Sequence, residues 1–538
     1  MKKFFVMVIC IFVCVSLASC AVKSDTYEIE TTMTESTQET TTAAETNTAA
    51  ENSDATTTTE ETTTAAKKQF TFTVPSGSEV TVNGEVLDLE TASSAEIPEL
   101  IEYAAQYVDD IPEFVTVTAG FDTDNLTVSG TDINGNDLVF TNDGNSYSGV
   151  SSASQEFIDE VSERVSAGLS AWGLHFINCD DARPYVHYDS ELYGMIFGSA
   201  DYDWINNTFY NYETITSTNY STFEISNYVT FGSECFAVDV KYKLDVEFQD
   251  SSRHDDNQQL DATMVWIPEG DTWSIFDVTY KPEYKEYPSY EGVEFISLNE
   301  KTYTGTLIEV SDPSKVSVGV IDDLGSTTGL KIKELMEQYN SEGVNVIAAT
   351  NGGDFVDEGT YIYTGTPLGL VISDGEIVYA DAGNDASYRI AGFTYDNKMI
   401  MGEYTANEAL EMGVRDAIYC EYTTGPFLIE NGQVRDDIPA SSSYGCGKNA
   451  RTAIGQKEDG TILLLCVNGR QSNSLGATIE DLADIMLEYG AVNAVTMDGG
   501  SSSQMGAKYA DGSYEYINNP FTPAFGPRAC PTFWIVKE

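Results

Sequence analysis

An apolar segment that ends in a carboxylate, glycines and hydroxyl residues constrains the fold more than any other part of the sequence. Its residues are Ala494-Val495-Thr496-Met497-Asp498-Gly499-Gly500-Ser501-Ser502-Ser503. The apolar part predicts a buried strand, and glycines after a strand let the backbone turn with positive φ and approach a ligand closely. Successive N–H groups in such a turn can form a concavity that binds anions, with Asp498 at its edge. Because Asp-Gly also forms ordinary turns, this segment alone leaves a plain turn as the alternative.

Polar residues beside glycine recur at the ends of other predicted strands in the same half of the chain. Residues 351–354 (Asn-Gly-Gly-Asp) follow the apolar run 344–350, and residues 468–470 (Asn-Gly-Arg) follow the run 463–467. Arg451 opens a further predicted strand. Ligand sites favour the loops that strand ends carry. The repetition therefore favours a site over a set of unrelated turns.

The N-terminus has the form of a bacterial secretory signal. Lys2 and Lys3 precede the apolar run 4–15, which is too short to be an ordinary membrane span. The segment Leu17-Ala18-Ser19-Cys20 resembles a lipobox, in which cleavage precedes a cysteine that then carries lipid. We predict a lipoprotein signal peptide over residues 1–20 and a lipid anchor on Cys20, which would hold the protein at the extracellular face of the membrane, on the cell surface. The alternative is an ordinary signal peptide whose cleavage site happens to end in cysteine.

The composition of residues 21–67 predicts a tether, and the overall charge excludes some classes of partner. Thr, Glu, Ala, Asn and Ser dominate residues 21–67, which cannot bury enough apolar surface to fold and are predicted to be a disordered tether. The formal net charge is −59, which argues against nucleic acid as a partner. It also argues against a basic membrane-binding patch, so the lipid would be the membrane attachment.

The sequence predicts a multidomain chain after the tether. Residues 69–149 alternate apolar and polar residues around Asn83-Gly84 and are predicted to form a small β-sandwich. Residues 150–283 begin with an amphipathic helix and continue in long Tyr-, Thr- and Val-rich runs, and this order resembles the α+β cone of nuclear transport factor 2. Residues 284–293 are a predicted linker. Residues 294–538 are predicted to be an α+β catalytic domain with a mixed sheet.

The last domain excludes several kinds of catalytic site. It contains no histidine, so a Ser-His-Asp triad and an H-E-x-x-H metal site are ruled out within it. The sequence also has no C-x-x-C pair, which argues against a thiolate zinc site. No cofactor is evident, and a requirement for a divalent metal stays open. Export permits disulfides, and Cys179 and Cys235 lie in one predicted domain and could pair, but spacing does not determine connectivity.

Six motifs in order resemble the phosphodiester glycosidase family. They are Asn351-Gly352-Gly353-Asp354-Phe355, Gly425-Pro426, Arg451-Thr452-Ala453-Ile454-Gly455, Asn468-Gly469-Arg470, Ser474-x-Gly476 and Asp498-Gly499-Gly500-Ser501-Ser502. The best-known type of member is the uncovering enzyme, which removes N-acetylglucosamine from a phosphodiester, and bacterial relatives include exopolysaccharide-related proteins. The resemblance covers residues 296–538 and departs from the family at two positions. Members usually carry Asp where Asn468 stands, and many carry an aromatic residue where Asp354 stands.

The resemblance implies a set of site residues. Predicted catalytic residues are Asp498, Asp354, Arg451 and Arg470. Predicted substrate-binding residues are Asn351, Gly352, Gly353, Gly425, Thr452, Asn468, Ser474, Gly499, Gly500, Ser501, Ser502 and Arg528. Without histidine, acid–base work would fall to carboxylates, and arginine suits phosphate through its fork of donors. Alternatively, Arg451 and Arg470 neutralise some of the many acids, and Asp354, Ser501 and Ser502 belong to plain turns. Asn351 is expected to orient other groups.

These inferences predict an extracellular hydrolase that cleaves the glycosidic bond of sugar-1-phosphodiesters in cell-surface or extracellular glycans. A phosphomonoester with a second pKa of about 6 is a good leaving group, so strong acid assistance would be less necessary. The alternative is a non-catalytic glycan-binding lipoprotein of the cell surface. Asp498, Arg451 and the glycines favour the enzyme, whereas the Asn468 departure favours the binding protein. The predicted partners are therefore a glycan or glycophosphate and, through Cys20, the membrane.

Overall fold

The structure is a computed structural model, and it describes residues 67–177, 182–198, 215–249, 254–325, 328–356, 363–421, 425–443, 445–521 and 527–538. The predicted signal peptide, the lipid anchor Cys20, nearly all of the predicted tether and Cys179 lie outside these residues. Within them, no helix is both long enough and apolar enough to cross a membrane.

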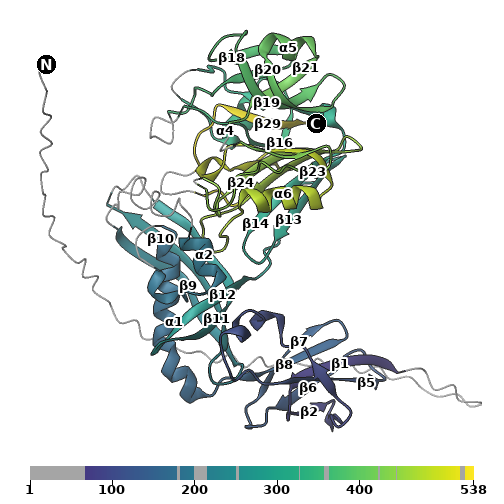
Figure 1. The fold of residues 1–538 in the computed structure, drawn as a ribbon, viewed down its shortest axis with the longest axis vertical. Helices are drawn as coiled ribbons and strands as arrows, with labels where there is room; N and C mark the ends of the chain where they lie inside the picture. Colours follow the sequence, from purple (N-terminus) through teal and green to yellow (C-terminus); the bar gives the residue numbers. More distant parts are fainter. Residues whose placement is uncertain are drawn as a thin grey trace, which may run out of the picture. The chain divides into compact units, whose positions relative to one another are not determined.

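Residues 68–152 form strands that belong to two sheets (Figure 1). The strands are β1 (Lys68–Pro75), β2 (Glu79–Val82), β3 (Glu85–Val86), β4 (Ser93–Ala95), β5 (Phe114–Phe121), β6 (Val128–Thr131), β7 (Leu138–Asp143) and β8 (Ser146–Ser152). The predicted hairpin joins β2 to β3, with Asn83 at φ 52° and Gly84 at φ 84°. Alternate residues of β1 (Phe70, Phe72) and of β2 (Val80, Val82) share one buried core, as period-two patterning requires.

Residues 155–280 place helices before a long antiparallel sheet, in the predicted order. The helices are α1 (Gln155–His175) and α2 (Glu191–Phe197), and the strands are β9 (Ile215–Thr230), β10 (Phe236–Phe248), β11 (His254–Glu269) and β12 (Thr272–Tyr280). The buried face of α1, which includes Val161, Val165 and Leu169, packs on this sheet (Figure 1). β9 also pairs with β8, so the sheet continues across residue 150. The predicted boundary at that residue lies inside β8, and the resemblance to nuclear transport factor 2 stays a prediction.

The C-terminal part, from Val293 onward, contains three sheets. The seven-stranded sheet, in spatial order, has β13 (Val293–Asn299), β14 (Thr304–Val310), β25 (Ile462–Val467), β24 (Arg451–Lys457), β26 (Ala491–Thr496), β22 (Phe427–Glu430) and β23 (Gln433–Val434). A five-stranded sheet has β15 (Val316–Val320), β29 (Thr532–Lys537), β16 (Val346–Asn351), β27 (Met505–Lys508) and β28 (Tyr514–Tyr516). A second five-stranded sheet has, in spatial order, β18 (Glu376–Ala380), β17 (Leu370–Ser373), β21 (Val414–Tyr419), β19 (Ser387–Thr394) and β20 (Met399–Thr405).

The helices of this part are α4 (Ile332–Ser341), α5 (Ala406–Glu411) and α6 (Ile479–Glu488). α6 packs on the seven-stranded sheet through Ile479, Leu482 and Met486 (Figure 1). A second core joins the three sheets and contains Val318, Phe393 and Val495. The site described below lies where strands of two of these sheets end.

The predicted mixed sheet in this domain is wrong. Every strand pair in the described residues from Val293 to the C-terminus is antiparallel. The short connection 458–461 requires antiparallel pairing of β24 with β25, because parallel neighbours need a long crossover. The one parallel pair of named strands, β1 with β8, lies in the N-terminal part of the described chain.

The described cysteines give no support to a disulfide framework. Cys235, Cys420, Cys466 and Cys530 are buried thiols that form no disulfide. The suggested partner of Cys235, Cys179, lies outside the described residues. Burial raises the pKa of the Cys420 thiol to about 12 and that of Cys466 to about 12, so both are neutral at physiological pH.

Candidate active site

Antiparallel pairing brings the predicted strand ends to one edge of the seven-stranded sheet. Arg451 at the start of β24 lies opposite Val467 at the end of β25. Two residues further along β24, Ala453 lies opposite Thr496 at the end of β26. In an antiparallel sheet the beginning of one strand lies beside the end of the next. Antiparallel pairing therefore brings Arg451, the 468–470 loop and Asp498 to the same edge of the sheet. They meet there although the strands are not parallel.

Asn351 joins this edge to the end of β16 in the neighbouring sheet. Its Nδ2 donates to the carbonyl of Asp498 at 2.8 Å, and its Oδ1 accepts from Thr452 Oγ1 at 2.8 Å and from the Gln504 amide at 3.2 Å. The amide of Asp498 also donates to the carbonyl of Gly352 at 3.1 Å. Asn351 is fully buried, so it positions the Asp498 loop rather than contacting a ligand.

The glycines of the site allow close packing of its loops. A Cβ at Gly352 would lie 2.5 Å from Thr532 Oγ1, and a Cβ at Gly353 would lie 2.6 Å from the Tyr419 carbonyl. Gly500 has φ +64°, and its amide donates to the Ala450 carbonyl at 2.8 Å. Side chains at these positions would push the strand ends apart or strain the turn.

The carboxyl groups of Asp498 and Asp354 are neighbours, close enough for Asp354 to affect the pKa of Asp498. Asp498 Oδ1 accepts from the amide of Gly499 at 2.8 Å. Burial raises the pKa of Asp498, whereas the nearby Ser502 hydroxyl, the charge of Arg528 and the interaction with Asp354 each lower it, and the result is a raised pKa. Two neighbouring carboxyl groups cannot both ionise without strong repulsion, so the pair retains one proton to a higher pH than an ordinary carboxyl would.

Arg528 and Ser502 complete the surroundings of Asp498. The amide of Arg528 donates to the Ser501 carbonyl at 3.0 Å, which attaches its segment to the glycine turn. The guanidinium lies 5.9 Å from the ring centroid of Phe355, the neighbour of Asp354. Ser502 is fully buried, and its Oγ makes no hydrogen bond of normal geometry with any described residue. The site thus presents a carboxyl pair, a guanidinium and a hydroxyl together.

Arg451 is held by backbone carbonyls. Its Nε donates to Ala477 at 3.1 Å, and its Nη2 donates to Gly445 at 2.8 Å and to Gly447 at 2.6 Å. The side chain is 5% exposed. Its Nη1 nevertheless lies 3.8 Å from where a Cβ on Gly499 would be, which places the guanidinium behind the glycine turn. These contacts favour a supporting role for Arg451 over the predicted catalytic one.

We therefore expect Arg451→Lys to destabilise the protein. A lysine cannot reach all three carbonyls with one fork, and each buried acceptor left without a donor costs about 1–3 kcal/mol. Chemical denaturation should show a loss of about 2–4 kcal/mol in the free energy of unfolding. Arg435→Lys, at a partly exposed arginine that binds Glu430 and Asp437, should change this quantity by less than about 1 kcal/mol. Equal stability of the two variants would contradict the supporting role.

Asn468 and Ser474 also hold the framework of the site. Asn468 Nδ2 donates to Thr304 Oγ1 at 2.9 Å, and its Oδ1 accepts from the amide of Asn519 at 2.7 Å. Ser474 Oγ donates to the carbonyl of Asn468 at 2.8 Å. Arg470 lies between them with φ +53°, and its amide donates to the Leu475 carbonyl at 3.2 Å. The amide at position 468 therefore has structural partners where most of the family carries a carboxylate.

Gly425, a predicted substrate-binding residue, is held by Arg389. Its carbonyl accepts from Arg389 Nη1 at 2.8 Å, and the Arg389 guanidinium lies 3.6 Å from the ring centroid of Phe427. Arg389 thus holds the segment that precedes β22, and sequence analysis missed it. The only local signal was an arginine within an apolar strand.

Gln504 is the second residue that sequence analysis missed. It is fully buried, and its Nε2 donates to the Arg528 carbonyl at 2.8 Å while its Oε1 accepts from the Ile332 amide at 2.9 Å. Its carbonyl accepts from the Asn351 amide at 3.2 Å. It therefore ties the Arg528 segment to the Asn351 loop. The signal in the sequence was the position of Gln504 directly after Ser503, at the end of the Asp498 motif.

The loop that carries Arg470 is also packed against the middle of the chain. Trp172 Nε1 of α1 donates to the Ser472 carbonyl at 3.1 Å, and Ser472 Oγ donates to the Gln259 carbonyl at 2.9 Å. Ser472 is fully buried, and Leu475 belongs to the core that α1 shares with its sheet. Residues upstream of the C-terminal domain therefore help to order a loop next to the candidate site.

The described residues contain no group of three His, Cys, Asp or Glu side chains able to hold a metal ion. The candidate site consists of the Asp498–Asp354 pair, Arg528, Ser502 and the glycine turn.

Comparisons with known proteins show relatives of the C-terminal part of this chain. Residues 344–537 match the family model for phosphodiester glycosidase. The SPbeta prophage-derived protein YomE of Bacillus subtilis is 31% identical over 160 residues, which are 29% of this chain and 23% of YomE. The N-acetylglucosamine-1-phosphodiester alpha-N-acetylglucosaminidase of Mus musculus is 25% identical over 219 residues, 38% of this chain and 40% of that protein. The chain thus spans less than half the length of these curated relatives.

Solved structures to which the chain has some similarity include the zebrafish N-acetylglucosamine-1-phosphodiester alpha-N-acetylglucosaminidase catalytic domain, auto-inhibited by its pro-peptide. That structure is 22% identical, with a TM-score of 0.36, and the match covers 46% of this chain and 82% of that one. A putative exported protein of Burkholderia pseudomallei is 16% identical, with a TM-score of 0.31, and the match covers 44% and 74%. The family model thus places residues 344–537 in the phosphodiester glycosidase family, and the curated matches include glycosidases that act on phosphodiesters.

Proposed function

We propose that this chain is an extracellular hydrolase that cleaves the glycosidic bond of sugar-1-phosphodiesters in cell-surface or extracellular glycans. The observation that carries the proposal is the Asp498–Asp354 carboxyl pair beside the positive charge of Arg528, in a domain of this family. The domain has no histidine to act as base, so the carboxyl pair is the available acid–base group.

The proximity of the carboxyl groups suggests how they divide the work. Ordinary glycosidases place two carboxyl groups about 5 Å or more apart, on opposite sides of the bond that breaks. Asp498 and Asp354 are close neighbours, so they act from one side as a single unit. Asp498 is the nucleophile or general base, and Asp354 exchanges the shared proton and orients it. The departing phosphomonoester needs little protonation, which removes the need for an acid on the opposite side.

Arg528 is the cation placed to stabilise the departing phosphate. In this reaction the bond from the anomeric carbon to the phosphate oxygen breaks, and water supplies the new hydroxyl of the sugar. The phosphate gains negative charge as that bond breaks, and a guanidinium stabilises such charge through paired donors. Ser502 and the amides of the glycine turn are suited to bind sugar or phosphate oxygens.

The expected result of the basic assay is release of free sugar. The full mature chain should convert the benzyl phosphodiester of N-acetylglucosamine 1-phosphate into N-acetylglucosamine and benzyl phosphate, measured by chromatography. The products distinguish this reaction from phosphodiester hydrolysis, which would release N-acetylglucosamine 1-phosphate and benzyl alcohol. If a panel of sugar-1-phosphodiesters binds but none is cleaved, the alternative is correct and the chain is a glycan-binding lipoprotein.

The amide at position 468 does not by itself favour that alternative. Asn468 contacts Thr304 and Asn519, and its hydrogen bonds do not involve the carboxyl pair. The change from the family's usual carboxylate therefore affects the framework of the domain. The two carboxyl groups proposed to transfer protons, those of Asp498 and Asp354, are both present.

We also propose that the mature protein is attached to the membrane by lipid on Cys20. The short apolar run 4–15 and the segment Leu17-Ala18-Ser19-Cys20 support this location. Cys20→Ala should move the exported protein from the membrane fraction to the medium, as measured by immunoblotting of both fractions. Ser19→Ala keeps the small residue before the cleavage site and should leave the protein on the membrane. An exported, cleaved Cys20→Ala protein that stays membrane-bound would place the anchor elsewhere.

A further inference from the structure

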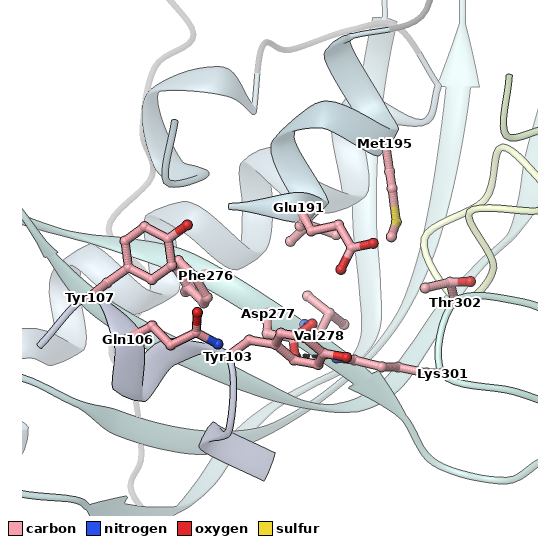
Figure 2. A pocket seen from close by; sticks show the side chains of 11 residues that line it. Tyr103, Gln106, Tyr107, Glu191, Met195, Phe276, Asp277, Val278, Lys301 and Thr302 are labelled. Atoms are coloured by element: carbon pink, nitrogen blue, oxygen red, sulfur yellow. Dashed lines mark hydrogen bonds and ion pairs between the residues drawn. The ribbon is translucent and has the colours of Figure 1, made fainter. Parts of the chain in front are cut away.

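We propose that a pocket outside the candidate active site binds a neutral sugar ring of a glycan. The pocket is formed by residues 103–107, 191–195, 276–278 and 301–302, and Figure 2 shows their side chains around it. The wider suggestion that this glycan is the substrate polymer rests on the function proposed above. The binding site itself is argued from the residues of the pocket.

The aromatic walls of the pocket suit a sugar. The pocket is open to solvent on one side, and its empty volume, which includes part of that open space, is about 580 Å³. Tyr103 and Tyr107 are 51% and 50% exposed. Their rings therefore leave apolar surface in contact with water, which a ligand could cover. Tyr107 is braced by Phe276, with ring centroids 4.9 Å apart. A sugar ring can cover such faces with its C–H groups.

The polar groups of the pocket suit hydroxyl groups. Gln106 supplies an amide, Glu191 a carboxylate and Thr302 a hydroxyl, and in Figure 2 they lie around the tyrosines. A small number of polar groups on aromatic walls fixes the orientation of a ligand and supplies specificity. These groups both donate and accept hydrogen bonds, as the hydroxyls of a sugar do.

Charge in the pocket argues against a phosphate or a cation as the occupant. Lys301 Nζ lies 2.5 Å from Asp277 Oδ2 and 4.8 Å from the ring centroid of Tyr103. Its charge is thereby neutralised, and Glu191 adds a negative charge that would repel phosphate. The same ammonium already lies over one face of Tyr103, so an incoming cation would meet a like charge there. A neutral ring meets no such repulsion.

The pocket is connected to the loop beside the candidate active site. The carbonyl of Thr302 accepts from the amide of Leu475 at 2.9 Å, and Thr304 Oγ1 accepts from Asn468 at 2.9 Å. Residues 301–302 thus belong to the segment that supports the Arg470 loop. A long glycan held at the pocket would keep further bonds of the same chain near that loop, which is the advantage of a second binding site.

The test measures binding of phosphate-free glycans to the full mature chain. A tetramer of N-acetylglucosamine and a tetramer of glucose are titrated by calorimetry, with glucosamine tetramer as the cationic comparison. A neutral tetramer should bind, and Tyr103→Ala and Tyr107→Ala should each weaken it about 2- to 10-fold, as expected for loss of an aromatic contact. Tyr284→Ala, at a tyrosine that is 86% exposed and outside the pocket, should bind like the wild type.

Separate outcomes distinguish this proposal from the proposed function. Binding should persist in Asp498→Asn, and Tyr103→Ala should hydrolyse a small sugar-1-phosphodiester at the wild-type rate. A chain that shows tyrosine-dependent binding but no hydrolysis would retain this site and lose the proposed function. Absence of binding to both neutral tetramers would overturn the pocket. So would equal affinity of the tyrosine variants and the wild type, loss of binding in Asp498→Asn, or preference for the glucosamine tetramer.

Discussion

Asp498→Asn should lower kcat on a sugar-1-phosphodiester by at least about 10²-fold, the lower end of what general acid–base catalysis contributes. The substitution keeps the shape of the side chain and removes its charge and its proton exchange with Asp354. The loop itself should persist, because Asn351 and Gly352 hold Asp498 through its backbone. Steady-state kinetics with purified full-length chain measures the effect.

The same variant should be more stable than the wild type at neutral pH. Burial raises the pKa of Asp498 in the folded state, so its contribution to stability is present below the unfolded pKa and is lost as pH rises through the folded pKa. At pH 7, which is above the unfolded-state pKa, ionisation favours the unfolded state of the wild type, and the asparagine variant lacks this penalty. The difference in Tm between variant and wild type should therefore shrink as pH falls toward 4.

Asp459→Asn is the matched control for Asp498→Asn. Asp459 caps an exposed turn by accepting from the Thr461 amide at 3.0 Å, so its substitution should leave kcat unchanged. Near-normal turnover by Asp498→Asn would remove Asp498 from the mechanism and transfer the role of base to Asp354. Lower stability of Asp498→Asn at pH 7 would contradict the buried-charge argument.

Arg528→Ala should slow hydrolysis of a sugar-1-phosphodiester by about 10²–10³-fold, the usual effect of removing one group that stabilises developing negative charge. The charge of Arg528 lowers the pKa of Asp498. Hydrogen bonds with Ser501 and Gln504 hold the backbone of Arg528 next to the site. Arg528→Lys should recover only part of the rate, because an ammonium lacks the planar fork.

Comparison of leaving groups makes the Arg528 prediction specific. On a nitrophenyl glycoside, which releases a phenol without phosphate, the penalty of Arg528→Ala should be at least about tenfold smaller than on the phosphodiester. Arg435→Ala, at a partly exposed arginine distant in sequence, should affect neither substrate. Equal penalties of Arg528→Ala on both substrates would mean that Arg528 does not act on the departing phosphate.

The sequence by itself determined the local features of this protein. Period-two patterning predicted the strands, and Asn83-Gly84 predicted the hairpin between β2 and β3, because these signals depend on neighbouring residues alone. The same holds for the strand ends at Asn351, Arg451 and Asp498, where polar residues next to glycine stand out against apolar runs. The lack of histidine in residues 294–538 limited the possible chemistry, because it is a property of composition and does not depend on folding.

Only the tertiary structure decided how these features come together. Strand order showed that antiparallel pairing gathers the strand ends, and that β16 reaches Asp498 from another sheet through Asn351. The structure also distinguished the roles of Arg451 and Arg528. Arg451 is bound to buried carbonyls behind the glycine turn, whereas Arg528, far along the chain, acts on the carboxyl pair. Sequence cannot distinguish these roles, because the direction and partners of a side chain depend on elements that are distant in the chain and packed against it.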